Sequence, residues 1–406
     1  MDPGTGHRWC AYPDGTCPSG YRYSDIQVGD NVSGMCVPGM DAGVDAKPGE
    51  ADIVLGQEDF TGMSPNHGAS GDRITAQSMY LPAGIAIDSA TGSIWVADSA
   101  NTRVLGWRPA PIASFAAATV VVGQQTFDAR DGDIVSISRW TTLDLNVGLA
   151  AGGDKLLVPN IHSSRVLVFG PTPVANLPNA SLVLGQADFA SSKTGSGASD
   201  FAGPSAVWTD GARVAVTDTF NNRVLIWSSF PTRNGQPANV VLGQLDFGMS
   251  AFPDTPSASS LHYPDGVYSD GTRLYVSDTQ NNRVLIWNSF PTVNGQAADV
   301  VLGQSTFATS NSGTSDITLR EPRGIAVAGN TLFIADWGNN RVLAYSPIPT
   351  RAGASAKYVI GQPDLMSGTA GVTRSLLHAP HYLAAQGREL YVSDSANHRV
   401  MRFRLQ

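Results

Sequence analysis

The heptapeptide NNRVLIW occurs at residues 221–227 and again, letter for letter, at 281–287. The residues that follow are repeated as well: SSFPTRNGQPANVVLGQLDF follows the first copy and NSFPTVNGQAADVVLGQSTF the second. Self-similarity at a fixed period is the sequence signature of repeat architectures. The duplication therefore predicts a fold built of similar units, each about sixty residues long.

Two short signatures show how many units the chain contains. A Val-Leu-Gly-Gln-like motif occurs six times, with its glutamines at Gln57, Gln124, Gln186, Gln244, Gln304 and Gln362. An Arg-Val motif also occurs six times, at Arg103, Arg165, Arg223, Arg283, Arg341 and Arg399. Successive arginines of this motif lie 58 to 62 residues apart. Six units therefore account for the chain from Ala51 to Gln406.

Each unit contains four strand-like runs. In the fourth unit these runs are DGVYSD (265–270), RLYVSD (273–278), RVLIW (283–287) and ADVVLGQ (298–304). Short runs rich in β-branched and aromatic residues, bounded by Gly, Asp, Asn or Pro, are typical of strands. Apolar residues fall on both faces of these runs, so the strands should be covered on both sides. Four-stranded sheets repeated radially give an all-β, six-bladed β-propeller.

The two ends of the repeat region indicate how the ring closes. The chain ends on the third run of the sixth unit, RVMRFRLQ (399–406), and its repeats begin with a lone fourth run, ADIVLGQ (51–57). Pairing of that run with residues 381–405 would complete the last blade. A solenoid is the rival architecture, but its terminal units should be polar caps, and these are not. We therefore predict a short Cys-containing extension and linker at 1–50 and a closed propeller at 51–406.

The stretch LHYPDGVYSDGTRLYVSDTQNNRVLIW (261–287) resembles the NHL repeat, with a Pro-x-Gly-Ile-like start, a Val-x-Asp centre and an Asn-x-Arg-Val end. The resemblance covers essentially residues 51–406 and implies the propeller fold. Propellers of this family include binding platforms, scaffolds and a few enzymes, so the resemblance implies no single function.

One enzyme of this family, the peptidyl-hydroxyglycine amidating lyase, holds zinc with histidines at the starts of the innermost strands of three blades. The corresponding positions here are Ala83, Val147, Ser205, Asp265, Arg323 and His381. Only PHYL (380–383) matches the family's zinc-binding pattern. Because one histidine cannot build a three-histidine zinc site, we expect neither that lyase activity nor a metal centre.

The recurring polar residues have a structural interpretation. An aspartate precedes each Arg-Val motif, except in the second unit, where Asn160 takes its place; these residues are Asp98, Asp218, Asp278, Asp336 and Asp394. A turn aspartate can accept backbone N–H groups, and arginine offers a fork to a carboxylate or to carbonyl groups of the next blade. Six copies around a ring suit a structural contact better than one catalytic centre.

Information about function should lie where the copies differ. At the starts of the inner strands, the first three blades have Ala83, Val147 and Ser205, and the next three have charged or titratable residues. This pattern predicts an off-centre ligand pocket with a few convergent polar groups. Its expected residues are Asp265, Arg323, His381, Tyr382, Glu321, His378, His262 and Tyr263. The alternative is that a wet propeller channel tolerates polar residues without any ligand.

The first fifty residues have a different character, with all three cysteines and little hydrophobic periodicity. Cys10, Cys17 and Cys36 in a loop-rich segment predict a disulfide, and hence an extracytoplasmic location: secreted, periplasmic or cell-surface. A zinc knuckle with three thiolates is the other interpretation. A net charge of −8 argues against a nucleic-acid partner. No apolar run reaches the roughly 18 residues of a membrane span.

Two hypotheses about function follow. The favoured one is a non-enzymatic, exported binding or scaffold module that presents its channel-mouth face to a polar ligand, which is a peptide, a polysaccharide or a protein. The alternative is a lyase or hydrolase of a small anionic substrate, with His381 as base and Arg323 as anion clamp. The enzyme requires Asp265, Arg323 and His381 to converge within hydrogen-bond reach. Neither hypothesis needs a cofactor, and both leave room for a channel-bound cation such as calcium.

Overall fold

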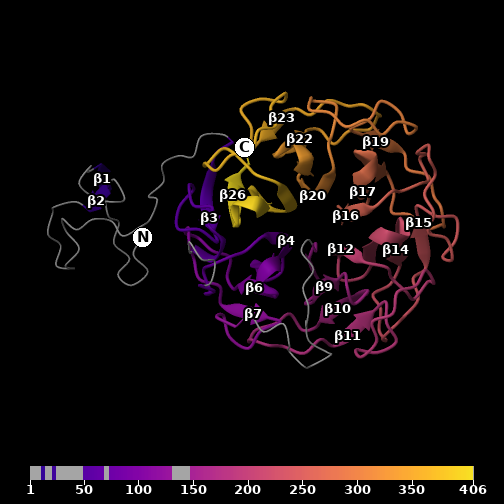
Figure 1. Ribbon diagram of the computed structural model, residues 1–406, viewed down its shortest axis with the longest axis horizontal. Helices are drawn as coiled ribbons and strands as arrows, with labels where there is room; N and C mark the ends of the chain where they lie inside the picture. Colours follow the sequence, from indigo (N-terminus) through magenta and orange to yellow (C-terminus); the bar gives the residue numbers. More distant parts are fainter. Residues whose placement is uncertain (1–10, 14–20, 24–48, 68–72, 130–146, 406) are drawn as a thin grey trace.

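The computed structural model describes residues 11–13, 21–23, 49–67, 73–129 and 147–405. Six antiparallel, four-stranded sheets are arranged as blades around a central axis, which confirms the predicted six-bladed β-propeller (Figure 1). Strands β1 (Ala11–Pro13) and β2 (Tyr21–Tyr23) form a separate antiparallel pair. The division of the chain at residue 50 stays a prediction. Cys10, Cys17 and Cys36 lie outside the described residues.

Blades 1 to 5 run from the inner to the outer strand in chain order. Blade 1 contains β4 (Pro82–Asp88), β5 (Ser93–Asp98), β6 (Arg103–Trp107) and β7 (Val120–Val122). Blade 2 contains β8 (Ala150–Ala151), β9 (Leu156–Asn160), β10 (Arg165–Phe169) and β11 (Leu182–Leu184). Blade 3 contains β12 (Pro204–Thr209), β13 (Val214–Asp218), β14 (Arg223–Trp227) and β15 (Val240–Leu242). Blade 4 contains β16 (Pro264–Ser269), β17 (Leu274–Asp278), β18 (Arg283–Trp287) and β19 (Val300–Leu302). Blade 5 contains β20 (Pro322–Ala328), β21 (Thr331–Asp336), β22 (Arg341–Tyr345) and β23 (Tyr358–Ile360).

Blade 6 joins the two ends of the propeller. It consists of β24 (Pro380–Gln386), β25 (Glu389–Asp394), β26 (Arg399–Arg404) and, as its outer strand, β3 (Ala51–Leu55). The predicted closure by the first strand of the repeat region is therefore confirmed. Arg402 of β26 also holds Asp52 of β3 with a fork of two hydrogen bonds, of 2.9 and 2.8 Å.

The middle strands are apolar on both faces because each blade is packed between two others. All five residues of β14, RVLIW, are buried. Side chains of its two faces belong to different clusters: Val224 and Ile226 pack with residues of blade 4, and Leu225 packs with residues of blade 2. Burying one such aliphatic side chain contributes about 1.5–3 kcal/mol. The pattern in the sequence thus reflects burial from both sides, as predicted.

A buried arginine fastens each blade to the chain segments that lead into it and out of it. In blade 4, Nε of Arg283 donates to Oδ2 of Asp278 (2.7 Å). Its Nη2 donates to the carbonyl oxygens of Ser257 (2.9 Å) and Ser260 (3.0 Å), which precede the blade. Its Nη1 donates to the carbonyl oxygen of Phe307 (2.6 Å), which follows the blade. The carbonyl groups therefore belong to the connecting segments of the arginine's own blade, rather than to the next blade.

This contact, which we call the arginine clasp, recurs around the ring. The ion pair between aspartate and arginine is buried and measures 2.6–2.7 Å in the five blades that have the aspartate. In blade 2, with Asn160 in place of the aspartate, Arg165 still donates to the carbonyl oxygen of Phe189 (2.7 Å). The structural interpretation of these recurring residues is therefore correct.

A second contact joins each of blades 3, 4 and 5 to the next blade. A short 3-10 helix follows the second strand, at η2 (Ser99–Asn101), η3 (Thr219–Asn221), η4 (Thr279–Asn281), η5 (Trp337–Asn339) and η6 (Ser395–Asn397). The left-handed residue after η4 is Asn282, and its side-chain oxygen accepts the backbone N–H of Glu321 (2.9 Å). Asn222 and Asn340 make the same contact. After η6 the residue is His398, whose Nδ1 accepts the backbone N–H of Leu81 (3.1 Å). A titratable group thus stands where the ring closes.

We predict that this closing contact is sensitive to acid. Burial, together with a smaller effect of nearby His378, lowers the pKa of His398 from 6.5 to about 4. The neutral ring is the acceptor, so its stabilisation is complete above pH 6.5 and is lost as the pH falls towards 4. Allowing for its partial exposure, the loss amounts to about 1–3 kcal/mol. Unfolding in urea between about pH 7.5 and pH 4.5 measures this loss.

His398→Asn is the matched variant, because asparagine makes this contact in three other blades. It should keep the contact and flatten the pH dependence of the free energy of unfolding. Parallel pH profiles for the natural protein and the variant would show that His398 does not control the closure.

Candidate functional site

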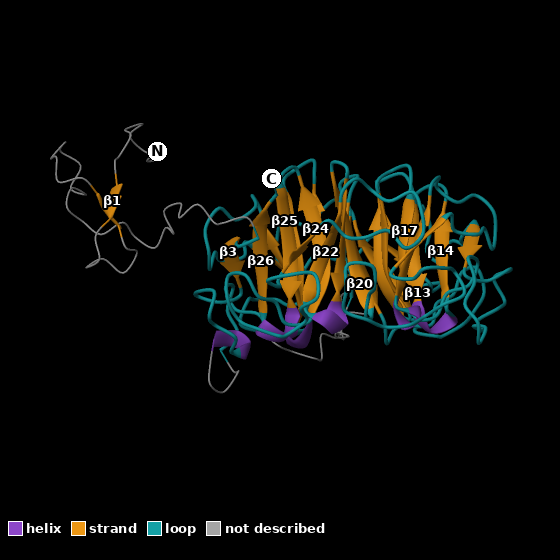
Figure 2. Cartoon of the chain, turned by 90° about the horizontal axis from the view of Figure 1, so that it is seen from above, coloured by secondary structure: helices purple, strands orange, loops and turns teal. Residues whose placement is uncertain are grey.

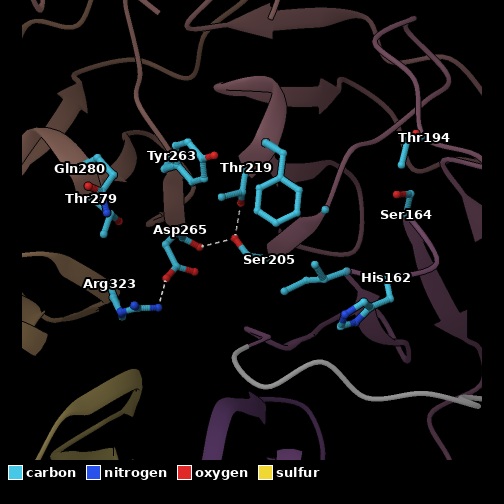
Figure 3. Close-up of a pocket in the computed structure, with 13 residues that line it drawn as sticks. His162, Ser164, Thr194, Ser205, Thr219, Tyr263, Asp265, Thr279, Gln280 and Arg323 are labelled. Carbon is cyan, nitrogen blue, oxygen red and sulfur yellow. Dashed lines mark hydrogen bonds and ion pairs between the residues drawn. The ribbon is translucent and has the colours of Figure 1, made fainter.

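A cavity of about 580 Å³ opens at the mouth of the central channel. It lies on the face of the propeller that carries the 3-10 helices (Figure 2). Its wall comes from blades 2 to 5, so the cavity is displaced from the axis. The lining residues are Ile161, His162, Ser164, Thr194, Gly203, Ser205, Thr219, Phe220, Tyr263, Asp265, Thr279, Gln280 and Arg323 (Figure 3).

The floor of the cavity is an ion pair whose carboxylate is held on both oxygens. Nη1 of Arg323 donates to Oδ2 of Asp265 at 2.5 Å, and the hydroxyl of Tyr382 donates to Oδ1 at 2.6 Å. The side chains of Arg323 and Asp265 are 17% and 9% exposed. The guanidinium also lies over the ring of Trp337, 4.6 Å from its centroid. The pair is therefore oriented and electrically neutral as a unit.

Hydroxyl groups of blade 3 hold the backbone that carries Asp265. Ser205 Oγ lies 2.6 Å from Thr219 Oγ1 and donates to the carbonyl oxygen of Asp265 at 3.2 Å (Figure 3). Thr219 Oγ1 donates to the carbonyl oxygen of Pro264 at 2.8 Å. Ser205 therefore belongs to the polar part of the mouth, although its place in the sequence grouped it with the small apolar residues of blades 1 and 2.

Tyr382 separates this cavity from a second one further along the channel. It is buried, and it lines a cavity of about 230 Å³ that is otherwise formed by inner strands. Its ring packs on Gly148 across the channel: a Cβ atom at residue 148 would lie 2.5 Å from ring atom Cε1. Burial raises the pKa of Tyr382 well above its usual value, and the charge of Asp265 raises it further. The hydroxyl therefore stays protonated and donates to Asp265.

His381 is also buried, but it does not line the cavity. Burial and the positive charge of Arg323 lower the pKa of His381 well below 6.5. Its ring lies edge-on to Tyr382, with centroids 5.1 Å apart. Among the described residues, its Nδ1 has no hydrogen-bond partner. The ring is thus a neutral group behind the cavity.

Three of the eight residues predicted for the site line the cavity: Asp265, Arg323 and Tyr263. The other five, which do not line it, are His262, Glu321, His378, His381 and Tyr382. His378 is exposed while His381 is buried, so the two histidines do not face one site. The predicted set is therefore brought together only in part.

Several lining residues were not predicted from the sequence, above all Phe220 and Gln280. Both occupy the second position after the clasp aspartate, and the other blades with that aspartate have Ala100, Gly338 and Ala396 there. The clasp residues on either side are nearly constant. Variation at this position within one chain was the signal that could have found them.

The residues at the inner-strand starts do not fit a three-histidine zinc centre. Ala83 and Val147 have no donor atom, and the hydroxyl of Ser205 is used in contacts within the protein. In the described part of the chain, no group of three His, Cys, Asp or Glu side chains is placed to hold a metal ion.

Fold and site together define a six-bladed β-propeller with a polar cavity at its channel mouth. The NHL repeat family model matches residues 319–345, which span the first three strands of blade 5. The match is thus to one NHL repeat in blade 5, and the other blades are built as similar four-stranded units.

Solved structures with a similar fold include a chain of the nidogen/laminin complex and an aldose sugar dehydrogenase. The first is 13% identical, with 72% of this chain and 84% of that chain covered and a TM-score of 0.42. The second, the PQQ-bound form from Streptomyces coelicolor, is 13% identical, with 81% and 96% covered and a TM-score of 0.45. Both are too distant to indicate what this chain binds. A search of curated protein sequences finds no match. Within the described residues, no helix has the length and apolar character to cross a membrane.

We predict that Tyr382 contributes to stability mainly through its ring. Tyr382→Phe removes one hydrogen bond to a buried carboxylate and should cost about 1–3 kcal/mol. Tyr382→Ala also removes the packed ring and should cost about 3–5 kcal/mol and join the two cavities. Urea unfolding of both variants measures the difference. Equal losses would show that the ring does not fill the channel.

Proposed function

We propose that this propeller is a binding module that holds a polar ligand (a peptide, a glycan or part of a protein) in the channel-mouth cavity. The observation that supports this most is the fixed Asp265–Arg323 pair at the floor of a concave, off-axis cavity. Ligand sites are typically concave and carry a few polar groups in set positions. Here those positions are set by a second layer of contacts, from Tyr382 and Ser205.

The wall of the cavity offers neutral polar groups and aromatic rings. Gln280 and Thr194 are exposed, and Tyr263 and Phe220 present large parts of their rings to solvent. Among the lining residues that the structure describes, only Asp265 and Arg323 carry a permanent charge, and each neutralises the other. The ligand that suits this wall is polar and carries no large net charge.

The enzyme hypothesis has less support. Asp265 and Arg323 converge, but His381 does not line the cavity, and its pKa is lowered well below 6.5. An effective general base has a pKa near the operating pH and lies within reach of the substrate proton. Arg323 is already paired with Asp265, so it is a poor clamp for a small anion. The geometry therefore favours binding over lyase or hydrolase chemistry.

An extracytoplasmic location is part of the same proposal. It is supported by the three cysteines in the first 36 residues of the sequence, since disulfides persist in oxidising compartments. Mass measurement after alkylation without reduction tests it: one disulfide is expected, and three alkylated thiols would contradict it.

A pair of substitutions tests the cavity. Asp265→Asn with Arg323→Gln replaces the ion pair by two amides of similar shape, so no buried charge is left alone. Asp210→Asn with Arg213→Gln makes the same change in a 2.7 Å ion pair outside the cavity. A thermal-shift screen of neutral sugars, acidic sugars and short peptides should identify ligands of the natural protein.

Those ligands should bind the cavity variant about tenfold or more weakly, which corresponds to about 1.4 kcal/mol or more, and should bind the control variant unchanged. Equal binding to all three proteins would place the ligand elsewhere and contradict the proposal.

A further inference from the structure

Four aromatic rings form a continuous strip that begins in the wall of the cavity. Phe220 and Tyr263 line the cavity, with ring centroids 5.8 Å apart. The ring of His262 lies 5.5 Å from that of Tyr263, and the ring of Phe252 is stacked on His262 at 3.7 Å. Phe220, Tyr263 and Phe252 are 54%, 40% and 45% exposed. These four residues, which we call the aromatic strip, lead from the cavity over the junction of blades 3 and 4.

Backbone hydrogen bonds hold three residues of the strip, and one of these bonds also joins blade 3 to blade 4. Asn222 accepts the N–H of Tyr263 at 2.9 Å, and Asp278 accepts the N–H of His262 at 2.6 Å. The N–H of Phe220 donates to the carbonyl oxygen of Ala202 at 3.0 Å. Exposed rings on a fixed backbone bind with little loss of conformational entropy. The part of the strip formed by Phe220, Tyr263 and His262 is therefore a preformed surface, and Phe252 extends it by stacking on His262.

The repeats show that the framework does not require these rings. The positions equivalent to Phe220 hold Ala100 in blade 1 and Ala396 in blade 6. The position equivalent to Tyr263 holds Ala379 in blade 6, with the same left-handed backbone. Exposed aromatic side chains that the fold does not need indicate an interaction surface.

We propose that the strip and the cavity together bind a neutral polysaccharide, with one end of the chain in the cavity and the following sugars along the strip. This inference rests on the proposed function and names its ligand class. Sugar rings carry apolar C–H faces that pack on aromatic rings, and hydroxyl groups that hydrogen-bond to amides, hydroxyls and carboxylates. The strip supplies the rings, while the cavity supplies the exposed polar side chains of Gln280 and Thr194.

The electrostatics of the site favour a neutral sugar chain over an anionic one. An acidic polysaccharide needs cations that are free to pair with its charges. In the described part of the cavity wall, Arg323 is the only Lys or Arg, and it is bound to Asp265. The whole sequence is also acidic, with a net charge of −8. A neutral sugar chain is not repelled by the negative charge of the protein.

Affinity electrophoresis tests the proposal with laminarin, arabinoxylan, hydroxyethylcellulose and dextran as neutral probes. Polygalacturonate, heparin and a proline-rich peptide represent the other ligand classes. At least one neutral polysaccharide should retard the natural protein. Phe220→Ala and Tyr263→Ala should each weaken that binding by about tenfold or more, as expected for exposed aromatic anchors. The matched control is Tyr358→Ala, which removes a ring of similar exposure (38%) from a strand outside the site.

The length of the sugar chain distinguishes the strip from the cavity. Calorimetry with the disaccharide to the hexasaccharide of the retained polysaccharide should show affinity rising with length. Phe252→Ala, at the far end of the strip, should weaken the longest oligosaccharides about fivefold or more and leave the disaccharide unchanged. Asp265→Asn with Arg323→Gln should weaken every length.

Each other outcome overturns a defined part of the account. Binding that depends on the Asp265–Arg323 pair but not on Phe220, Tyr263 or Phe252 contradicts the strip and leaves the proposed function standing. Binding of only acidic polysaccharides or of the peptide contradicts the ligand class. If no neutral polysaccharide retards the protein, this inference is wrong. The thermal-shift screen with the cavity variant then tests separately whether the cavity binds a ligand.

Discussion

The structure depends on a buried arginine that recurs in every blade. Taking a guanidinium out of water is costly unless every donor finds a partner. In blade 4 the partners are the carboxylate of Asp278 and three carbonyl oxygens of the segments on either side of the blade. The arginine thereby fixes the path by which the chain enters and leaves the blade.

Because the clasp and the blade-joining asparagines hold the framework, the positions beside them are free to vary. Phe220 and Gln280 lie within the same short turns as clasp residues. Tyr263 is held through its backbone by Asn222, so its side chain is not needed for the fold. The proposed ligand site is thus built on a scaffold of fixed backbone, with side chains that differ from blade to blade. The aromatic rings lie at the junction of blades 3 and 4, and the Asp265–Arg323 pair lies at the junction of blades 4 and 5.

The fold could be predicted well from the sequence because each of the six blades needs the same buried strands and the same clasp arginine. Burial on both faces, the Asp and Arg of the clasp and the offset first strand were all visible as repeats, and strand β3 does complete blade 6. The site was predicted less well because it depends on which way each side chain of an inner strand points. The pairing of β24 with β25 shifts register between Pro380 and Leu383. Blades 1, 3, 4 and 5 shift register at the same point, so simple alternation does not show which of these side chains face the cavity. Arg323 lines it, whereas His381 and Tyr382 do not.

Residue types alone could not predict which side chains at the channel mouth are free to contact a ligand, because contacts between distant residues decide this. Arg323, His381 and Asp265 were predicted as three available groups, but a contact between neighbouring blades pairs Arg323 with Asp265, and His381 is buried. Ser205 was grouped with the small apolar residues, but its hydroxyl donates to the carbonyl oxygen of Asp265 in the next blade. These relations join residues about 60 to 180 positions apart.

The most direct test of this account is the free energy of unfolding of Arg283→Lys, measured in urea beside Arg273→Lys. Lysine keeps the charge but cannot reach the four oxygens that Arg283 contacts, whereas Arg273 is partly exposed and pairs with Asp270 at 3.3 Å. The account predicts a loss of about 3–5 kcal/mol for Arg283→Lys and less than about 1 kcal/mol for Arg273→Lys. Losses of equal size would contradict the claim that the arginine clasp holds the ring together.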